Sequence, residues 1–196
     1  MTEPHIVRIA LFGPSGAGKS TTSHLISAHC ETSGVKCSRL ALAEPLYKAQ
    51  AELYKIARRP LADPEVQDGE LLALLGRQLR RINPTVLTDD FSARLHDLIT
   101  DISLEKYDRY VVVCDDMRYP DWAALGRLEF VPVRIYATED DCDIRRRLRG
   151  DINMVSSASW TEHGLDMIPY VHTLNNTGTI ADLAMAVTGL LEELSA

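Results

Sequence analysis

The sequence has little of several features that would assign it to a specialised class of protein. Only 6% of its residues are aromatic, and its four cysteines fall in no CxxC pair and in no Cys/His spacing typical of a zinc site. It has no run of about 18 uncharged apolar residues. Its first five residues lack the basic and apolar regions of a signal peptide. We therefore expect a cytoplasmic protein with reduced thiols and no membrane partner.

Positive charge is also scarce. The chain has 21 Lys and Arg residues against 28 Asp and Glu residues, which gives a formal net charge of -7. A protein that coats nucleic acid with positive charge is therefore not expected, and any phosphate binding must be local. A chain of 196 residues with 45% hydrophobic residues can bury one sizeable core. We expect a single domain over residues 1–196.

The order of apolar segments predicts an α/β fold. Short β-branched runs alternate with stretches of helical period, which is typical of a parallel sheet covered by helices on both faces. The expected architecture is a three-layer sandwich with a five-stranded parallel sheet. The predicted strands are 6–12, 36–42, 110–114, 130–136 and 170–174. Residues 45–104 form a helical insertion between the second and third strands, with helices over 45–58, 69–82 and 88–104.

One motif points to a specific ligand. Residues 13–20 read Gly-Pro-Ser-Gly-Ala-Gly-Lys-Ser, a complete GxxxxGK[ST] phosphate loop between an apolar strand and a helix. Glycines let backbone N–H groups turn around phosphate oxygens, Lys19 can reach the β and γ phosphates, and the Ser20 hydroxyl can bind Mg²⁺. ATP and Mg²⁺ are the expected cofactors. The residues expected to bind ATP are Gly13, Ser15, Gly16, Ala17, Gly18, Lys19, Ser20 and Thr21.

Two acidic residues follow the apolar strand 110–114. A carboxylate at the C-terminal edge of a parallel sheet lies in the crevice where open α/β folds bind ligands. Asp115 or Asp116 can therefore hold Mg²⁺ or orient a substrate there, although paired acids also commonly end a strand in solvent.

The chain also carries two arginine clusters that suit a small-molecule kinase. Arg77, Arg80 and Arg81 share one face of a predicted helix and suit the phosphate of a second substrate. A second cluster lies on the helix after Thr138, within a short lid over 138–160 that can close over the transferring phosphoryl group; its members are Arg145, Arg146, Arg147 and Arg149. Either cluster can instead be a solvated basic face. The sequence has no Asn-Lys-x-Asp guanine motif, which argues against a GTPase switch.

On these motifs the sequence resembles P-loop nucleoside and nucleotide kinases, most closely the phage-type deoxynucleoside monophosphate kinases, with a fainter likeness to dephospho-coenzyme A kinase. Residues 42–46 are similar to a family Phe-Ala-Asp-Pro-Leu segment, and residues 116–120 to Asp-x-Arg-Phe-Pro. The resemblance implies that Glu44 or Asp116 orients the acceptor and that Arg118 is the family arginine. It also implies that the adenine lies beside residues 175–178, with Asn175, Thr177 and Gly178 as the binding residues. Tyr47 replaces a usual lysine, and Trp122 an expected acid, so the acceptor need not be an ordinary deoxynucleotide.

Together these features predict transfer of the γ-phosphoryl group from Mg-ATP to a nucleoside monophosphate or modified nucleotide, giving the diphosphate. The predicted catalytic residues are Lys19, Arg145, Arg149 and Asp116, and the predicted Mg²⁺ ligands are Ser20 and Asp116. The predicted substrate-binding residues are Glu44, Tyr47, Arg77, Arg80, Arg81 and Arg118. A kinase acting on the hydroxyl of a nucleoside, cofactor precursor or specialised metabolite and an ATP-binding regulatory protein are the alternatives. The sequence leaves a homodimer open.

Overall fold

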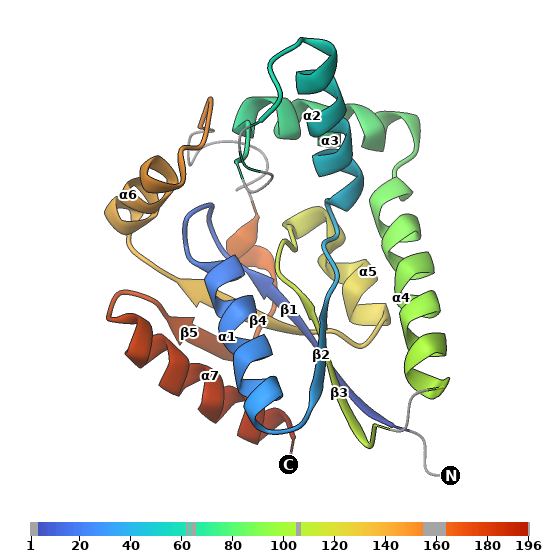
Figure 1. The fold of residues 1–196 in the computed structure, drawn as a ribbon, viewed down its shortest axis with the longest axis vertical. Coiled ribbons are helices and arrows are strands. Elements are labelled where there is room, and N and C mark those ends of the chain that lie inside the picture. Colours follow the sequence, from blue (N-terminus) through green and yellow to red (C-terminus); the bar gives the residue numbers. More distant parts are fainter. Residues whose placement is uncertain (1–3, 62, 64–65, 105–106, 155–163, 196) are drawn as a thin grey trace.

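The computed structural model describes residues 4–61, 63, 66–104, 107–154 and 164–195 (Figure 1). Its centre is one parallel sheet with the strand order β2-β3-β1-β4-β5. The strands are β1 (His5–Phe12), β2 (Lys36–Arg39), β3 (Arg109–Cys114), β4 (Val131–Tyr136) and β5 (His172–Asn175). The predicted five-stranded parallel sheet is therefore confirmed. Within the described ranges, no helix has the length and apolar character needed to cross a membrane.

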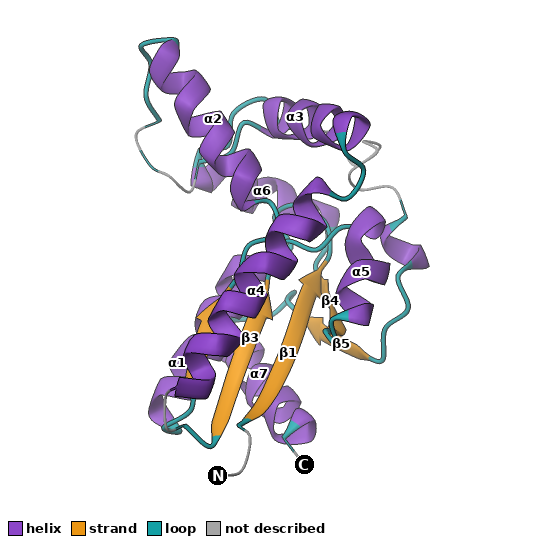
Figure 2. Cartoon of the chain, turned by 90° about the vertical axis from the view of Figure 1, so that its right-hand side faces the viewer, coloured by secondary structure: helices purple, strands orange, loops and turns teal. Residues whose placement is uncertain are grey.

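Helices cover both faces of this sheet because side chains alternate along its strands. On β1, Ile9 and Leu11 face one core, and Ala10 and Phe12 face the other. The first core is closed by α1 (Lys19–Thr32) and α7 (Ile180–Leu194), and the second by α4 (Val86–Leu104) and α5 (Trp122–Arg127). The three layers of the sandwich follow directly from this alternation (Figure 2).

The remaining helices stand beyond the carboxyl ends of the strands. Figure 2 shows α2 (Glu44–Ile56) and α3 (Gly69–Ile82) above that edge of the sheet, with α6 (Glu139–Arg149) beside them. The sequence predicted the insertion helices to within two residues at each end. It missed α5, which is too short to show a helical period, and the 3-10 turn η1 (Tyr119–Asp121) before it.

Three predicted strands differ from the structure by one residue at one end, and the other two differ more. The strand predicted over 36–42 ends at Arg39, because the backbone N–H groups of Leu42 and Ala43 donate to the carboxylate of Asp116 and have left the ladder. The strand predicted over 170–174 is His172–Asn175, since its register is set by pairing with β4, where Val133 lies opposite His172.

The helix ends agree with the capping signals in the sequence. Thr138 accepts a hydrogen bond from the backbone N–H of Asp141 at the start of α6, and Gly150 ends that helix in the left-handed region at φ 78°. At the start of α7, Thr179 and Asp182 form a reciprocal capping box. These caps fix where the arginine-bearing helix α6 begins and ends.

Candidate active site

The phosphate loop connects β1 to α1 and is packed closely by two other segments. A Cβ added to Gly16, at φ 86°, would lie 2.3 Å from the carbonyl oxygen of Cys142 in α6. A Cβ added to Gly18, at φ 102°, would lie 2.1 Å from the side-chain nitrogen of Asn176. Glycine is therefore required at both positions by the left-handed backbone and by the close approach of neighbouring atoms.

Lys19 spans this loop from the first turn of α1. Its Nζ donates to the carbonyl oxygens of Gly13 and Pro14, both at 2.8 Å, and the residue is only 9% exposed. Gly18 supplies no side-chain cap to α1, and the first N–H groups of a helix lack partners within the helix. The loop therefore combines backbone donors, a helix N-terminus and one ammonium group, which together form an anion site.

A cavity of about 250 Å³ opens in front of this loop. Five cationic side chains line it, and they come from four separate segments of the chain. The cavity is lined by Ser15, Gly16, Gly18, Lys19, Ser20, Thr21, Arg39, Tyr47, Gln67, Asp115, Asp116, Arg118, Arg145 and Arg149. We call it the phosphate cavity. Positive charge is thus concentrated in this cavity in a chain of net charge -7, which suits the local phosphate binding expected from the composition.

The two acids after β3 have different surroundings. Asp116 accepts hydrogen bonds from the backbone N–H groups of Leu42 at 2.7 Å and Ala43 at 2.9 Å, and its burial, together with the charge of Asp115, raises its pKa. Asp115 is 2% exposed and pairs with Arg39 at 2.8 Å. Among the residues that the structure describes, its second oxygen, Oδ2, has no hydrogen-bond partner. The unsatisfied carboxylate oxygen therefore belongs to Asp115, whereas Asp116 holds the segment before α2.

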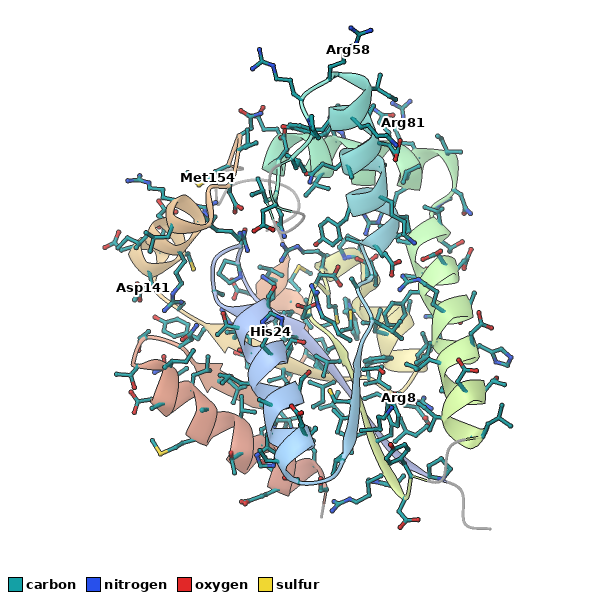
Figure 3. The ribbon with its side chains drawn as sticks, viewed as in Figure 1. Arg8, His24, Arg58, Arg81, Asp141 and Met154 are labelled. Carbon is teal, nitrogen blue, oxygen red and sulfur yellow. The ribbon has the colours of Figure 1, made fainter. Side chains whose placement is uncertain are left out.

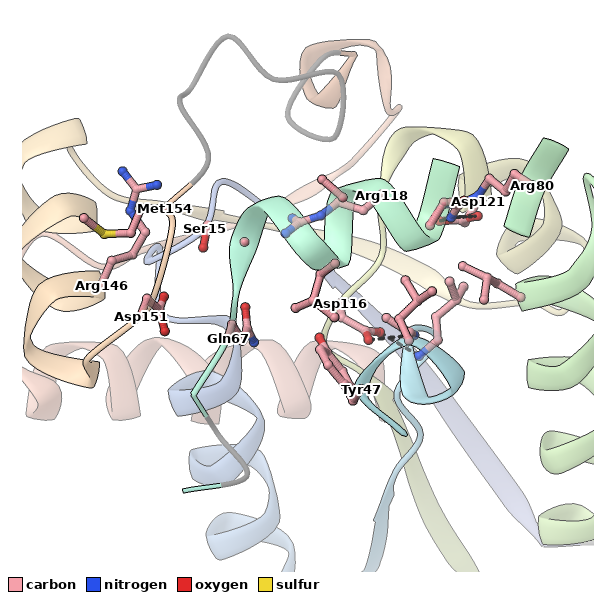
Figure 4. A pocket seen from close by; sticks show the side chains of 18 residues that line it. Ser15, Tyr47, Gln67, Arg80, Asp116, Arg118, Asp121, Arg146, Asp151 and Met154 are labelled. Atoms are coloured by element: carbon pink, nitrogen blue, oxygen red, sulfur yellow. Dashed lines mark hydrogen bonds and ion pairs between the residues drawn. The ribbon is translucent and has the colours of Figure 1, made fainter. Parts of the chain in front are cut away.

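A second cavity, of about 120 Å³, lies between this edge of the sheet and the helices α2 and α3 (Figure 4). Its walls are apolar near Leu46, Leu72 and Leu87. Arg80 and Asp121 form an ion pair in it, in which Arg80 Nη2 donates to both carboxylate oxygens at 2.9 Å. The other lining residues are Ser15, Leu42, Ala43, Tyr47, Gln67, Gly69, Ala73, Gly76, Asp116, Arg118, Arg146, Asp151 and Met154. We call it the acceptor cavity.

The two cavities adjoin one another. Ser15, Tyr47, Gln67, Asp116 and Arg118 line both of them. Arg118 also donates to the carbonyl oxygen of Gly13 at 3.0 Å, so its guanidinium lies against the phosphate loop. A ligand in one cavity would therefore lie beside a ligand in the other.

Three of the predicted substrate residues lie outside both cavities. Arg77 and Arg81 are exposed on α3, and Arg81 is labelled among the upper helices in Figure 3. Glu44 forms ion pairs with Lys48 at 2.6 Å and with Arg94 at 2.9 Å. Of the predicted substrate residues, the structure brings Tyr47, Arg80 and Arg118 together. Burial and the nearby carboxylate of Asp116 raise the pKa of the Tyr47 hydroxyl.

Helix α6 supplies arginines to both cavities. Arg145 donates to the carbonyl oxygen of Asn176 at 2.8 Å and lines the phosphate cavity. Arg149 lines the same cavity and pairs with Asp151, while Arg146 lines the acceptor cavity and pairs with Asp143. Arg147, the fourth predicted arginine, is exposed. Of the predicted lid over 138–160, residues 155–160 lie outside the described residues.

The loop after β5 contacts the phosphate loop through a residue that the sequence reasoning did not single out. The side chain of Asn176 is buried and donates to the carbonyl oxygen of Ala17 at 2.8 Å. Asn175 accepts hydrogen bonds from Thr177, and neither of these residues nor Gly178 lines either cavity. The signal that could have identified Asn176 was its position directly after β5. In the sheet, β5 lies next to β4, and β4 lies next to β1, which leads into the phosphate loop.

No family model and no curated protein sequence matches the chain. Among solved structures, the APS kinase of Mycobacterium tuberculosis in complex with AMPPNP and APS matches with a TM-score of 0.51 and 17% identity, covering 96% of this chain and 99% of the other. The chain therefore shares the α/β fold of this structure, a parallel sheet between two layers of helices. The protein TT1252 of Thermus thermophilus matches this fold with a TM-score of 0.50 and 21% identity over the full length of both chains. This shared fold agrees with the phosphate-loop motif in residues 13–20 and with the parallel sheet.

Proposed function

We propose that this protein transfers the γ-phosphoryl group of Mg-ATP to a nucleoside monophosphate or a modified nucleotide, giving the diphosphate. The observation that carries the proposal is the junction of two cavities. The phosphate loop lines one cavity, apolar side chains and a buried ion pair line the other, and both contain Arg118. A triphosphate on the loop would direct its terminal phosphoryl group toward an acceptor in the neighbouring cavity.

Phosphoryl transfer makes little covalent demand on the protein, because positioning and charge neutralisation supply most of the rate. Lys19, Arg145 and Arg149 line the phosphate cavity from two sides, and Arg118 stands at the junction. These cations would stabilise the charge that spreads over the transferring group. The apolar walls of the acceptor cavity would exclude water from the reaction and limit hydrolysis of ATP.

The residues in the phosphate cavity fit Mg²⁺. Ser20 supplies a hydroxyl, and Asp115 supplies a buried carboxylate oxygen that has no hydrogen-bond partner among the described residues. Oxygen ligands of this kind are those that Mg²⁺ prefers, and the bound ion would neutralise charge on the phosphate oxygens. The proposed ligands are therefore Ser20 and Asp115. The sequence-based choice of Asp116 is less suitable, since both its oxygens accept backbone N–H groups.

This assignment predicts separate effects for the two acids. Asp115→Asn should weaken Mn²⁺ binding, measured by electron paramagnetic resonance in the presence of the non-hydrolysable triphosphate AMPPNP, by about tenfold or more. Asp116→Asn should affect Mn²⁺ less, because its oxygens are held by Leu42 and Ala43. Equal Mn²⁺ affinities in wild type and Asp115→Asn would remove Asp115 from the metal site.

The acceptor cavity contains groups suited to two kinds of acceptor. Arg118 and Arg146 suit a monophosphate, because guanidinium groups bind phosphate oxygens in pairs. The leucine side chains of its walls suit the flat apolar face of a base. Asp116 favours the second candidate, a hydroxyl acceptor, since its carboxylate lies at the junction of the two cavities.

The test is a panel of nucleoside monophosphates and nucleosides incubated with ATP and Mg²⁺ and analysed by ADP release and product mass. A diphosphate product supports the first candidate, and a new monophosphate supports the second. Slow ATP hydrolysis that no panel member changes would instead favour an ATP-binding regulatory protein. Lys19→Ala is the control for a contaminating kinase.

A further inference from the structure

A short segment after α6 is joined to the segment that precedes α3. Ile152 donates its backbone N–H to the carbonyl oxygen of Gln67 at 3.0 Å and accepts from the N–H of Gly69 at 3.0 Å. The N–H of Glu70 donates to the carbonyl oxygen of Asn153 at 3.1 Å. Residues 151–153 and 67–70 thus form a small parallel bridge, which we call the latch.

Asp68 lies at the centre of the latch and is only 6% exposed. Its carboxylate caps α3 by accepting the N–H of Leu71 at 3.0 Å, and it accepts the Tyr54 hydroxyl of α2 at 2.7 Å. Asn153 donates its side-chain amide to the same carboxylate at 3.3 Å, and the N–H of Asp68 donates to the buried Gln50 side chain at 2.8 Å. One carboxylate therefore connects α2, α3 and the chain that leaves α6.

The latch borders both cavities. Asp151 lines the acceptor cavity and pairs with Arg149, which lines the phosphate cavity. Gln67, on the other half of the latch, lines both cavities. In Figure 4, Asp151 and Gln67 lie near one another, on the same side of the acceptor cavity as Arg146 and Met154. A displacement of residues 151–153 would therefore carry the α6 arginines with it.

We propose that Asp68 and Asn153 are positioning residues that lock α6 to the acceptor-side helices, so that Arg149 reaches the phosphate cavity only when the latch is closed. This inference rests on the proposed phosphoryl transfer. Because the latch forms part of the acceptor cavity wall, a bound acceptor favours its closed form. Acceptor binding and the position of Arg149 are thereby coupled through the latch.

The two side chains allow an exchange of donor and acceptor. Asp68→Asn keeps the helix cap, since asparagine caps as well as aspartate, but directs an amide toward the amide of Asn153. Asn153→Asp places a second carboxylate against Asp68. The double variant Asp68→Asn/Asn153→Asp restores the hydrogen bond in the opposite direction with the net charge of the wild type. Asparagine and aspartate both tolerate the φ of 47° at position 153.

Each single variant should lower kcat by about tenfold while changing KM for ATP by less than about threefold, and the double variant should recover most of the loss. Hydrogen exchange at the amides of Gly69 and Ile152 should be faster in the single variants and return to the wild-type rate in the double variant. Thermal unfolding of each variant separates a loss of folding from a loss of positioning.

Three results would overturn the latch: single variants with wild-type kcat, single variants with wild-type exchange, or a double variant that regains thermal stability without regaining kcat. Failure of the proposed function is a different result, because it appears as wild-type protein that phosphorylates no acceptor. The hydrogen-exchange measurement needs no substrate. It therefore tests whether the Asp68–Asn153 contact keeps the latch closed even if no acceptor is phosphorylated.

Discussion

Arg80→Ala removes one partner of a buried ion pair and should affect both stability and acceptor binding. The side chain of Arg80 is 18% exposed and that of Asp121 is 3% exposed, so the variant leaves a carboxylate without its guanidinium in the acceptor cavity. Breaking a buried pair on one side costs about 3 to 5 kcal/mol. Because Arg80 retains some contact with water, we expect a loss near the lower end, about 3 kcal/mol.

This loss can be measured as a change in Tm. For a chain of this length, 1 kcal/mol corresponds to about 2 to 4 °C, so Tm should fall by about 6 to 12 °C. Burial raises the pKa of Asp121, and Arg80 opposes that shift. Without Arg80 the pKa rises further, so the loss should be greatest at neutral pH and shrink as the pH falls and Asp121 takes up a proton. Adding Asp121→Asn should recover part of the loss at neutral pH.

Arg81→Ala is the matched control, because it removes the same side chain from the next position of α3, where it is exposed and outside both cavities. The assay pairs thermal unfolding with steady-state kinetics. Arg80→Ala should raise KM for the acceptor by about tenfold or more and leave KM for ATP within about threefold. If Arg80→Ala and Arg81→Ala gave equal Tm and equal KM for the acceptor, the assignment of the acceptor cavity would be wrong.

Three further predictions concern charges around the two cavities. Lys19→Ala should abolish transfer and keep a folded circular dichroism spectrum, because its Nζ holds loop carbonyls rather than core side chains; wild-type turnover would remove it from the active site. Arg145→Ala or Arg149→Ala should lower kcat by about a hundredfold with little change in ATP affinity, since such contacts tighten as charge spreads; kcat within threefold for both would assign them to a solvated face. In a carbon NMR titration, the pKa of Asp116 should lie above the ordinary aspartate value of 3.8 because the side chain is buried. The pKa of Asp182 should lie below 3.8 because its carboxylate accepts hydrogen bonds from Thr179. Asp182 therefore contributes stability that is present above pH 3.8 and lost as the pH falls through its lowered pKa.

Local signals in the sequence were sufficient to predict the phosphate loop, the parallel sheet and the helix caps. The phosphate loop, the apolar strand 110–114 and the caps at Thr138 and Thr179 each depend on residues within one short segment, and the structure contains all of them. The parallel sheet with helices on both faces also follows the α/β pattern, because helices that connect parallel strands must cover its faces. These features needed no knowledge of contacts between distant parts of the chain.

The identity of the site residues depended on distant contacts instead. The helical spacing placed Arg77, Arg80 and Arg81 on one face, but only Arg80 meets Asp121, which lies 41 positions away in the sequence. Glu44 was assigned to the acceptor, and Arg94, 50 positions away, pairs with it outside both cavities. Spacing along one helix cannot identify the partner that another element brings to it.

The choice between the two acids after β3 shows the same limit at a finer scale. Asp115 and Asp116 follow β3 directly, but different segments contact them, so their surroundings differ. Which of them keeps an unsatisfied oxygen depends on Arg39 of β2 and on the N–H groups of Leu42 and Ala43, which pair with them across the edge of the sheet. The sequence alone favoured Asp116 through a family resemblance, and the geometry favours Asp115 for Mg²⁺.

The most direct test of the central claim follows the γ-phosphoryl group itself. ATP labelled with ¹⁸O in the γ-phosphoryl group is incubated with the protein, Mg²⁺ and the panel of nucleotide and nucleoside acceptors, and the products are analysed by mass spectrometry. If the two adjoining cavities hold donor and acceptor, the label appears in a phosphorylated acceptor, and Lys19→Ala forms none of it. Label found only in inorganic phosphate, at a rate that no acceptor changes, would contradict the account.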